Sequence, residues 1–131
     1  MTTLVFCKTT FEGIHCWDNI PLSEPAQYLK FPHRHVFHIQ VGVEVDHNDR
    51  DVEIITLKHA VDEYIAHLFP DKCWGVPDMG HCSCEMLAEQ LKMEFGAVYV
   101  IVSEDGENGA ICFRWDEPLP AVVQSAMTDL C

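Results

Sequence analysis

Basic residues are scarce in this sequence. Among its 131 residues, 8 are Lys or Arg and 21 are Asp or Glu, which gives a formal net charge of -13. Proteins bind phosphate backbones mainly through cationic side chains that displace counterions. We therefore expect no nucleic acid partner.

Long apolar runs are also missing. The longest, from Ala97 to Val102, is far shorter than the roughly 20 residues that a membrane-spanning helix requires. The segment Met1–Phe11 does not have the charged start and apolar centre of a signal peptide. We expect no membrane partner and a cytoplasmic location. The length and the 48% apolar content predict a single folded domain over residues 1–131.

The cysteines do not indicate a disulfide framework. There are seven of them, an odd number, in a chain long enough to fold without covalent cross-links. We expect reduced thiols, with Cys7 and Cys112 buried as small apolar groups in strand-like runs.

The hydrophobic pattern predicts an α+β domain. Strict alternation over His33–Val45 is typical of a strand, and apolar residues at helical spacing favour two later helices. The order strand, strand, helix, helix, strand, strand predicts a four-stranded antiparallel sheet with both helices packed on one face. The predicted elements are strands over Thr3–Phe11 and His33–Val45, a short return strand over Val52–Ile55, helices over Leu57–Leu68 and Ser83–Phe95, strands over Ala97–Ser103 and Ala110–Trp115, and a short helix after Pro120.

Histidines form the first candidate site. His33 and His35 lie two residues apart on a strand, so both imidazoles project from one face. Such a pair is also typical of two half-exposed histidines without a special role. His15, just after the first strand, supplies a third nitrogen, and three His ligands with an open position are the pattern of catalytic zinc.

A rival metal site combines His81, Cys82 and Cys84, with Cys73 as a further ligand. The usual two-residue spacer between zinc-binding cysteines is absent, and Cys84 falls in the first turn of the second predicted helix. These features favour cysteines that pack at a helix start.

Two carboxylates are candidate binding groups. Glu85 lies in the first turn of the second predicted helix, where the helix dipole favours an anion. Glu104 lies at a strand end, where its carboxylate could accept two parallel hydrogen bonds from the edge of a pterin or guanine. Helix stabilisation and an ordinary turn position are the alternative interpretations.

Four short motifs together resemble the 6-pyruvoyl-tetrahydropterin synthase / 6-carboxy-tetrahydropterin synthase family. They keep the family's order and extend over the chain from Phe11 to Phe113. The motifs are FEGIH at Phe11–His15, HRHVF at His33–Phe37, SCEMLA at Ser83–Ala88, and VSE at Val102–Glu104 followed by Ala110.

The resemblance implies a fold and a site. The family has the tunnelling fold (T-fold), and its subunits form oligomers with pockets between them, so a homo-trimer or homo-hexamer is expected. Its three zinc histidines match His15, His33 and His35, and its pterin-anchoring glutamate matches Glu104. Glu85 matches the glutamate at the start of the family's second helix. The implied cofactor is Zn²⁺.

The proton-transfer groups of the family are not matched. Leu29 occupies the position of its catalytic cysteine, and Leu68, Phe69 and Pro70 occupy the region of its Asp-His pair, where Leu and Phe cannot transfer protons. The zinc motif also has Arg34 and Phe37 in place of Gly and Tyr. The candidate catalytic substitutes are Cys16, Cys73, His67 and Asp71.

Two functions remain open on these residues, with a purely structural protein as a weaker third. One is a zinc-dependent lyase acting on a dihydroneopterin triphosphate-like pterin through an altered proton relay, in pterin or deazaguanine (queuosine-type) biosynthesis. The other is a catalytically deficient relative that binds a pterin, purine or purine nucleotide through Glu104 and a pocket between subunits.

Overall fold

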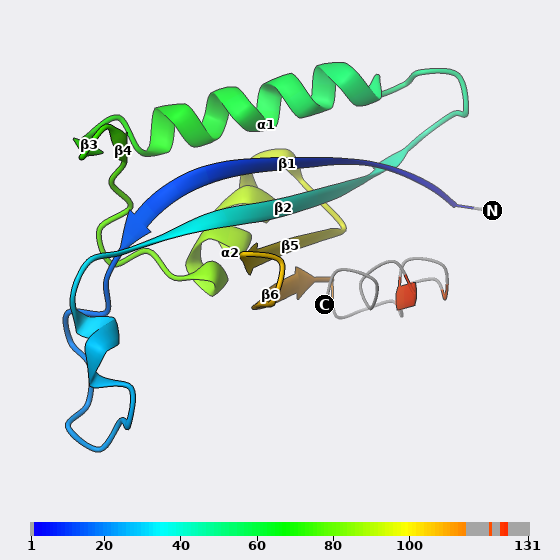
Figure 1. Ribbon diagram of the computed structural model, residues 1–131. Coiled ribbons are helices and arrows are strands. Elements are labelled where there is room, and N and C mark those ends of the chain that lie inside the picture. The colour runs from blue at the N-terminus through cyan, green and yellow to red at the C-terminus, as the bar shows by residue number, and fades with distance from the viewer. Residues whose placement is uncertain (1, 115–120, 122–123, 126–131) are drawn as a thin grey trace.

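The computed structural model describes residues 2–114, 121, 124 and 125. The chain forms an antiparallel sheet and two α-helices (Figure 1). The sheet order is β1-β2-β5-β6, and a separate small hairpin joins β3 to β4. This confirms the predicted α+β class. The elements are β1 (Thr3–His15), a 3₁₀ helix (Gln27–Lys30), β2 (His33–Val45), α1 (Ile54–Leu68), β3 (Lys72–Cys73), β4 (Val76–Pro77), α2 (Cys84–Phe95), β5 (Tyr99–Glu104) and β6 (Asn108–Phe113).

Strands β1 and β2 pair along their whole length. The register runs from Thr3 opposite Val45 to His15 opposite His33. β1 therefore continues past its predicted end at Phe11, because pairing with β2 holds its last residues in extended conformation. The loop 16–32 that joins the two strands projects beyond the end of the sheet (Figure 1).

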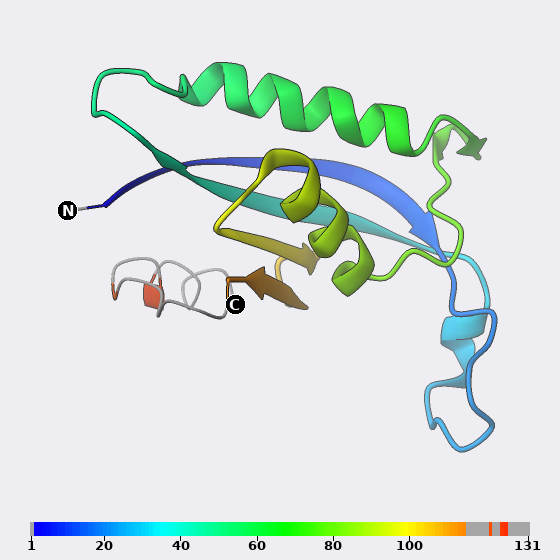
Figure 2. The ribbon, with the colours of Figure 1, turned by 180° about the vertical axis from the view of Figure 1, so that it is seen from behind.

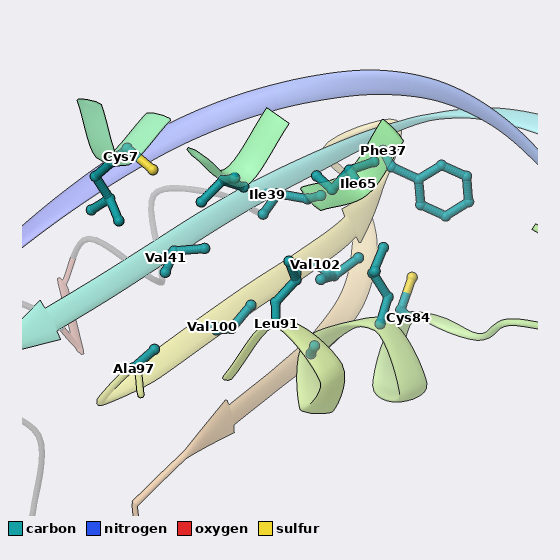
Figure 3. Close-up of a cluster of buried hydrophobic side chains, with 14 of the residues drawn as sticks. Cys7, Phe37, Ile39, Val41, Ile65, Cys84, Leu91, Ala97, Val100 and Val102 are labelled. Carbon is teal, nitrogen blue, oxygen red and sulfur yellow. The ribbon is translucent and has the colours of Figure 1, made fainter. Parts of the chain in front are cut away.

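Both helices cover the same face of the sheet. α1 lies along β1, whereas α2 lies over β5 and β6 (Figure 2). Side chains from both helices meet alternate residues of β2 and β5 in one apolar core (Figure 3). Burial of these side chains supplies the main favourable contribution to folding. The fully buried members of the core are Phe37, Val41, Val61, Leu87, Ala88, Leu91, Val100 and Val102.

The predicted return strand over Val52–Ile55 is wrong, because helix α1 begins inside it at Ile54. The side chain of Glu53 accepts hydrogen bonds from the backbone N–H groups of Ile55 and Thr56, which satisfies donors that a helix start leaves free. A strand here also has no partner beside β2, since β1 and β5 occupy both of its edges.

On the opposite face of the sheet, Tyr99 of β5 packs closely against β2. Tyr99 is 2% exposed, and its ring lies over Gly42, so closely that a Cβ atom at position 42 would overlap it. The Tyr99 hydroxyl accepts a hydrogen bond of 2.8 Å from Gln40 Nε2. Glycine is therefore required on β2 at this point.

The later part of the chain lies partly outside the described residues. The strand predicted over Ala110–Trp115 is β6 and ends at Phe113, and Trp115 is outside the described residues. The helix predicted after Pro120 is also outside them, apart from residues 121, 124 and 125. In the part of the chain that the structure describes, no helix has the length and apolar character needed to cross a membrane.

Candidate metal centre

The structure brings together the three histidines that the sequence singled out. His15 ends β1 and is the direct cross-strand partner of His33, the first residue of β2. His35 lies two residues further along β2 and therefore on the same face of the sheet. One candidate ligand nitrogen from each ring lies within 4.8 Å of the other two, so the three imidazoles can share one ion.

Each of these imidazoles has one nitrogen bound to an oxygen of the protein. His15 Nδ1 lies 2.8 Å from the carbonyl oxygen of Cys82, and His33 Nδ1 lies 2.8 Å from that of Phe31. His35 Nδ1 lies 2.7 Å from the Asp105 carboxylate. Because these oxygens only accept hydrogen bonds, they favour a proton on Nδ1 of each ring, which leaves Nε2 as the nitrogen that can bind a metal. Metal-ligating histidines are typically held in this way.

The Glu104 carboxylate lies against two of these Nε2 atoms. Its Oε1 is 3.2 Å from His15 Nε2, and its Oε2 is 3.3 Å from His35 Nε2. Burial opposes a charge on His15, but the close contact with Glu104 and the Cys82 carbonyl raise the pKa of His15 above its usual value. The contact with His15 in turn lowers the pKa of Glu104. The carboxylate is therefore charged at neutral pH.

The donor set fits a transition metal ion. His15 Nε2 is buried and has no aligned hydrogen-bond partner among the described residues. With all three protons on Nδ1, lone pairs of nitrogen and carboxylate oxygen face one another, and this arrangement is stable only with a cation or added protons between them. Burial lowers the pKa of His33, which favours its neutral, ligand-competent form. Imidazole nitrogens suit zinc, copper, iron and nickel.

A cavity of about 570 Å³ adjoins the histidines. Its lining includes His15 and His33 from the sheet, Glu104 from the end of β5, and Glu85 from the first turn of α2. The volume falls in the range of small-molecule sites. Ser83 fixes this end of α2, because its hydroxyl accepts a hydrogen bond from the Met86 backbone N–H. Both predicted binding carboxylates therefore border the space beside the candidate metal ligands.

The structure separates the four predicted catalytic substitutes into two groups. Cys16 lines the cavity, as does Leu29. His67, Asp71 and Cys73 are not part of the cavity lining. His67 lies in the last turn of α1, Asp71 lies between α1 and β3, and Cys73 is the last residue of β3. Of these four residues, Cys16 is therefore the one that could contact a ligand in the cavity of the same subunit.

The thiols that line the cavity are poorly ionised. Burial, with the nearby Asp18 and Asp78, raises the pKa of Cys16. Burial raises the pKa of Cys82 to about 11, and burial with Glu104 raises that of Cys84 to about 12. The nucleophilic form of cysteine is the thiolate, so these raised pKa values make the three thiols weaker nucleophiles at neutral pH than an ordinary cysteine.

The rival site of His81, Cys82, Cys84 and Cys73 is not assembled in the described residues, where only the three histidines bring three ligand atoms together. Cys84 is buried in the first turn of α2, as predicted, with its Sγ 3.8 Å from Glu104 Oε1.

The sequence did not indicate Asp105, the partner of His35, as a residue of the site. In the sequence, Asp105 is simply an acidic residue that follows Glu104 in a predicted turn, and nothing there links it to His35.

No protein-family model matches this chain, and no curated protein matches it either.

Proposed function

We propose that this protein is a zinc-dependent, T-fold relative of the 6-pyruvoyl/6-carboxy-tetrahydropterin synthases that acts on a dihydroneopterin triphosphate-like pterin. One observation carries the proposal: three histidines with free Nε2 lone pairs converge beside a cavity of about 570 Å³ that two carboxylates also line. The sequence motifs that resemble the family contain these same histidines and carboxylates.

In this proposal the ion is held by His15, His33 and His35. When bound, zinc supplies a Lewis acid that lowers the pKa of a coordinated hydroxyl group. Glu104 accepts two hydrogen bonds from the N–H edge of the pterin, as a charged carboxylate with two adjacent oxygens can do. Glu85 borders the same cavity and contacts the ligand from the start of α2. Of the four predicted catalytic substitutes, Cys16 is the one that lines the cavity and could transfer a proton there.

A second candidate function is binding of a pterin, purine or purine nucleotide without turnover. Leu29 lines the cavity at the position of the family's catalytic cysteine. Phe69, in the region of the family's Asp-His pair, is buried in the core and stacks on Phe11 with ring centroids 6.1 Å apart. Losing a general acid or base typically costs a factor of about 10²–10⁴ in rate. These replacements favour slow turnover or binding alone.

Oligomerisation is part of the proposal. Strands β1 and β6 are the edges of the sheet, and edge strands carry unpaired backbone groups that another strand can bind. We propose a cytoplasmic homo-trimer or homo-hexamer whose subunits complete the pocket. Multi-angle light scattering of the purified protein tests this, and a stable monomer at micromolar concentration would contradict it.

Two experiments test the function. Zinc-loaded protein is incubated with dihydroneopterin triphosphate, and released triphosphate is measured. Turnover supports the enzyme, whereas tight pterin or purine binding without triphosphate release supports the second function.

The metal site is tested by metal analysis of wild type and His33→Ala. His59→Ala, on the exposed surface of α1, is the matched control. Unchanged zinc content in His33→Ala would remove the proposed metal site.

Binding of the pterin edge has its own test. Glu104→Gln replaces a charged acceptor with an amide of the same shape, so pterin affinity is expected to fall. Glu107→Gln, a surface change in the next turn, is the control and keeps wild-type affinity. Equal pterin affinity in wild type and Glu104→Gln would show that Glu104 does not anchor the ligand.

A further inference from the structure

We propose that Asp105 is a positioning residue for His35: its carboxylate fixes the imidazole so that Nε2 is the atom presented to a metal. The inference rests on the metal site of the proposed function and adds a residue that neither the motifs nor the family resemblance assigned.

The contacts of Asp105 tie it to the strand segment that carries His35. One carboxylate oxygen, Oδ2, lies 2.7 Å from His35 Nδ1. The other, Oδ1, accepts a hydrogen bond of 2.9 Å from the Val36 backbone N–H. The backbone N–H of Asp105 donates to the Val36 carbonyl oxygen at 2.7 Å. With three contacts to two adjacent residues, the carboxylate has one orientation, and Oδ2 is directed at the ring.

The backbone at Asp105 explains why this residue type suits the position. Its φ is 56°, in the left-handed region, which Asn and Asp tolerate better than other non-glycine residues. The left-handed residue lies in the turn between β5 and β6, directly after Glu104. Glycine would also fit this conformation but would supply no carboxylate. Aspartate combines the conformation with an anionic acceptor.

The three histidines differ in what holds their Nδ1 atoms. His15 and His33 are bound by main-chain carbonyl oxygens, which are present whatever the side chain at those positions. His35 alone among the three is bound by a side chain. A carboxylate is a stronger acceptor than a carbonyl, and it makes the metal-binding nitrogen of its partner more basic. The orientation and basicity of His35 therefore depend on the side chain of Asp105, which a single substitution can change.

Asp105→Asn provides a sharp test, because it preserves shape and changes the hydrogen-bond direction. The Val36 N–H requires an acceptor at Oδ1, so the amide NH₂ group of Asn is directed at His35 Nδ1. An amide that donates to Nδ1 favours the tautomer with the proton on Nε2, and this tautomer cannot bind metal through Nε2. Asp105→Ala instead admits water, which can accept the Nδ1 proton. The expected order of zinc affinity is wild type, then Ala, then Asn.

The first measurement is the zinc dissociation constant, from competition with a chromophoric chelator. We expect Asp105→Asn to raise it about 10–100-fold, the usual effect of losing such a partner. The control Glu107→Gln removes one negative charge from the same turn and should leave the constant unchanged. If Asp105 only maintains the turn, the isosteric Asn variant binds zinc like wild type and Ala is the weaker binder; that order would overturn the proposal.

The second measurement does not require metal. Long-range ¹H–¹⁵N NMR of the metal-free protein, at a pH where His35 is neutral, reports which ring nitrogen carries the proton. We expect Nδ1–H in wild type and a shift towards Nε2–H in Asp105→Asn. The same tautomer in both would overturn the proposal. If wild type does not bind zinc, the proposed function fails, while this spectrum still decides whether Asp105 orients His35.

Discussion

The two halves of one face of β2 have opposite characters. Towards its start, this face carries His33 and His35, which border the polar site. Further along, the same face carries Ile39, Val41 and other apolar residues of the core. Phe37 lies at the boundary with 0% exposure, and its ring meets those of His15 and His35 edge-on, with centroids 5.2 and 5.9 Å apart. The site is therefore a continuation of the core, and close-packed apolar residues support its polar groups.

Phe37→Ala is expected to have the largest effect, because it disturbs both halves. Truncating a buried Phe typically costs about 3–5 kcal/mol of unfolding free energy. The cavity left beside His15 and His35 should also allow these rings to move, which weakens zinc binding. Urea denaturation and zinc competition measure the two effects.

Leu91→Ala is the matched control for that prediction. Leu91 is also 0% exposed but belongs to α2, within the apolar core. Its truncation should cost about 2–5 kcal/mol and leave zinc affinity unchanged in the folded protein. If Phe37→Ala binds zinc as tightly as wild type, the site does not depend on the core beneath it.

Zinc addition tests the polar half alone. At a free concentration of 100 times its dissociation constant, a ligand that binds only the native state adds about 2.7 kcal/mol of stability. We expect this gain in wild type and in His59→Ala, and a much smaller gain in His33→Ala at the same zinc concentration. Thermal unfolding with and without zinc measures it. Equal gains in all three proteins would mean that zinc binds elsewhere.

Gly42→Ala tests the opposite face of the same strand. The added methyl group overlaps the ring of Tyr99, which is buried and hydrogen-bonded to Gln40. Overpacking of this kind typically costs about 1–3 kcal/mol. The change should lower the urea midpoint and leave zinc affinity unaltered. Tyr99→Phe, which keeps the ring, is the comparison; a larger loss there would identify the hydroxyl, and not the close approach, as the sensitive contact.

Glu53→Gln should have the smallest effect, at the start of α1. Hydrogen bonds from the Ile55 and Thr56 backbone N–H groups hold the pKa of Glu53 below its ordinary value of 4.5. Since the folded pKa is the lower one, the charge contributes stability above about pH 4.5, and this contribution is lost as pH falls through the folded value. Wild type should exceed the Gln variant in urea midpoint at pH 7, and the difference should vanish in strong acid. A difference independent of pH would contradict this account.

The sequence predicted strand alternation better than element boundaries. The alternation of apolar residues in β2 correctly identified the face that packs against the core, because every second residue from Phe37 to Val43 belongs to the core. Local propensity did not reveal that β1 reaches His15, since pairing with β2 decides this. The β-branched Ile54 and Ile55 favoured a strand, but both lie exposed in the first helical turn after the Glu53 cap. Glutamate is not among the preferred capping residues, so the signal was weak.

The sequence predicted the three histidines and the two carboxylates of the candidate site, but not the groups that hold the histidines in place. The spacing of His33 and His35, with His15 added, was visible in the sequence because it depends on strand geometry. The partners of His15 and His35 lie 67 and 70 residues away along the chain. Such contacts depend on how β5 and the start of α2 dock on the sheet, and no local pattern reports that.

The location of the histidines also links the site to the loop 16–32. His15 immediately precedes this loop and His33 immediately follows it, so an ion held by both residues would reinforce the strand pairing that closes the loop at its base. Such a link would disfavour locally opened states in which the ends of β1 and β2 separate. Zinc removal by a chelator should then make peptide bonds in this loop, where Leu22 is 97% exposed, the first to be cut by a protease. Metal binding would in this way protect the loop 16–32 from proteolysis.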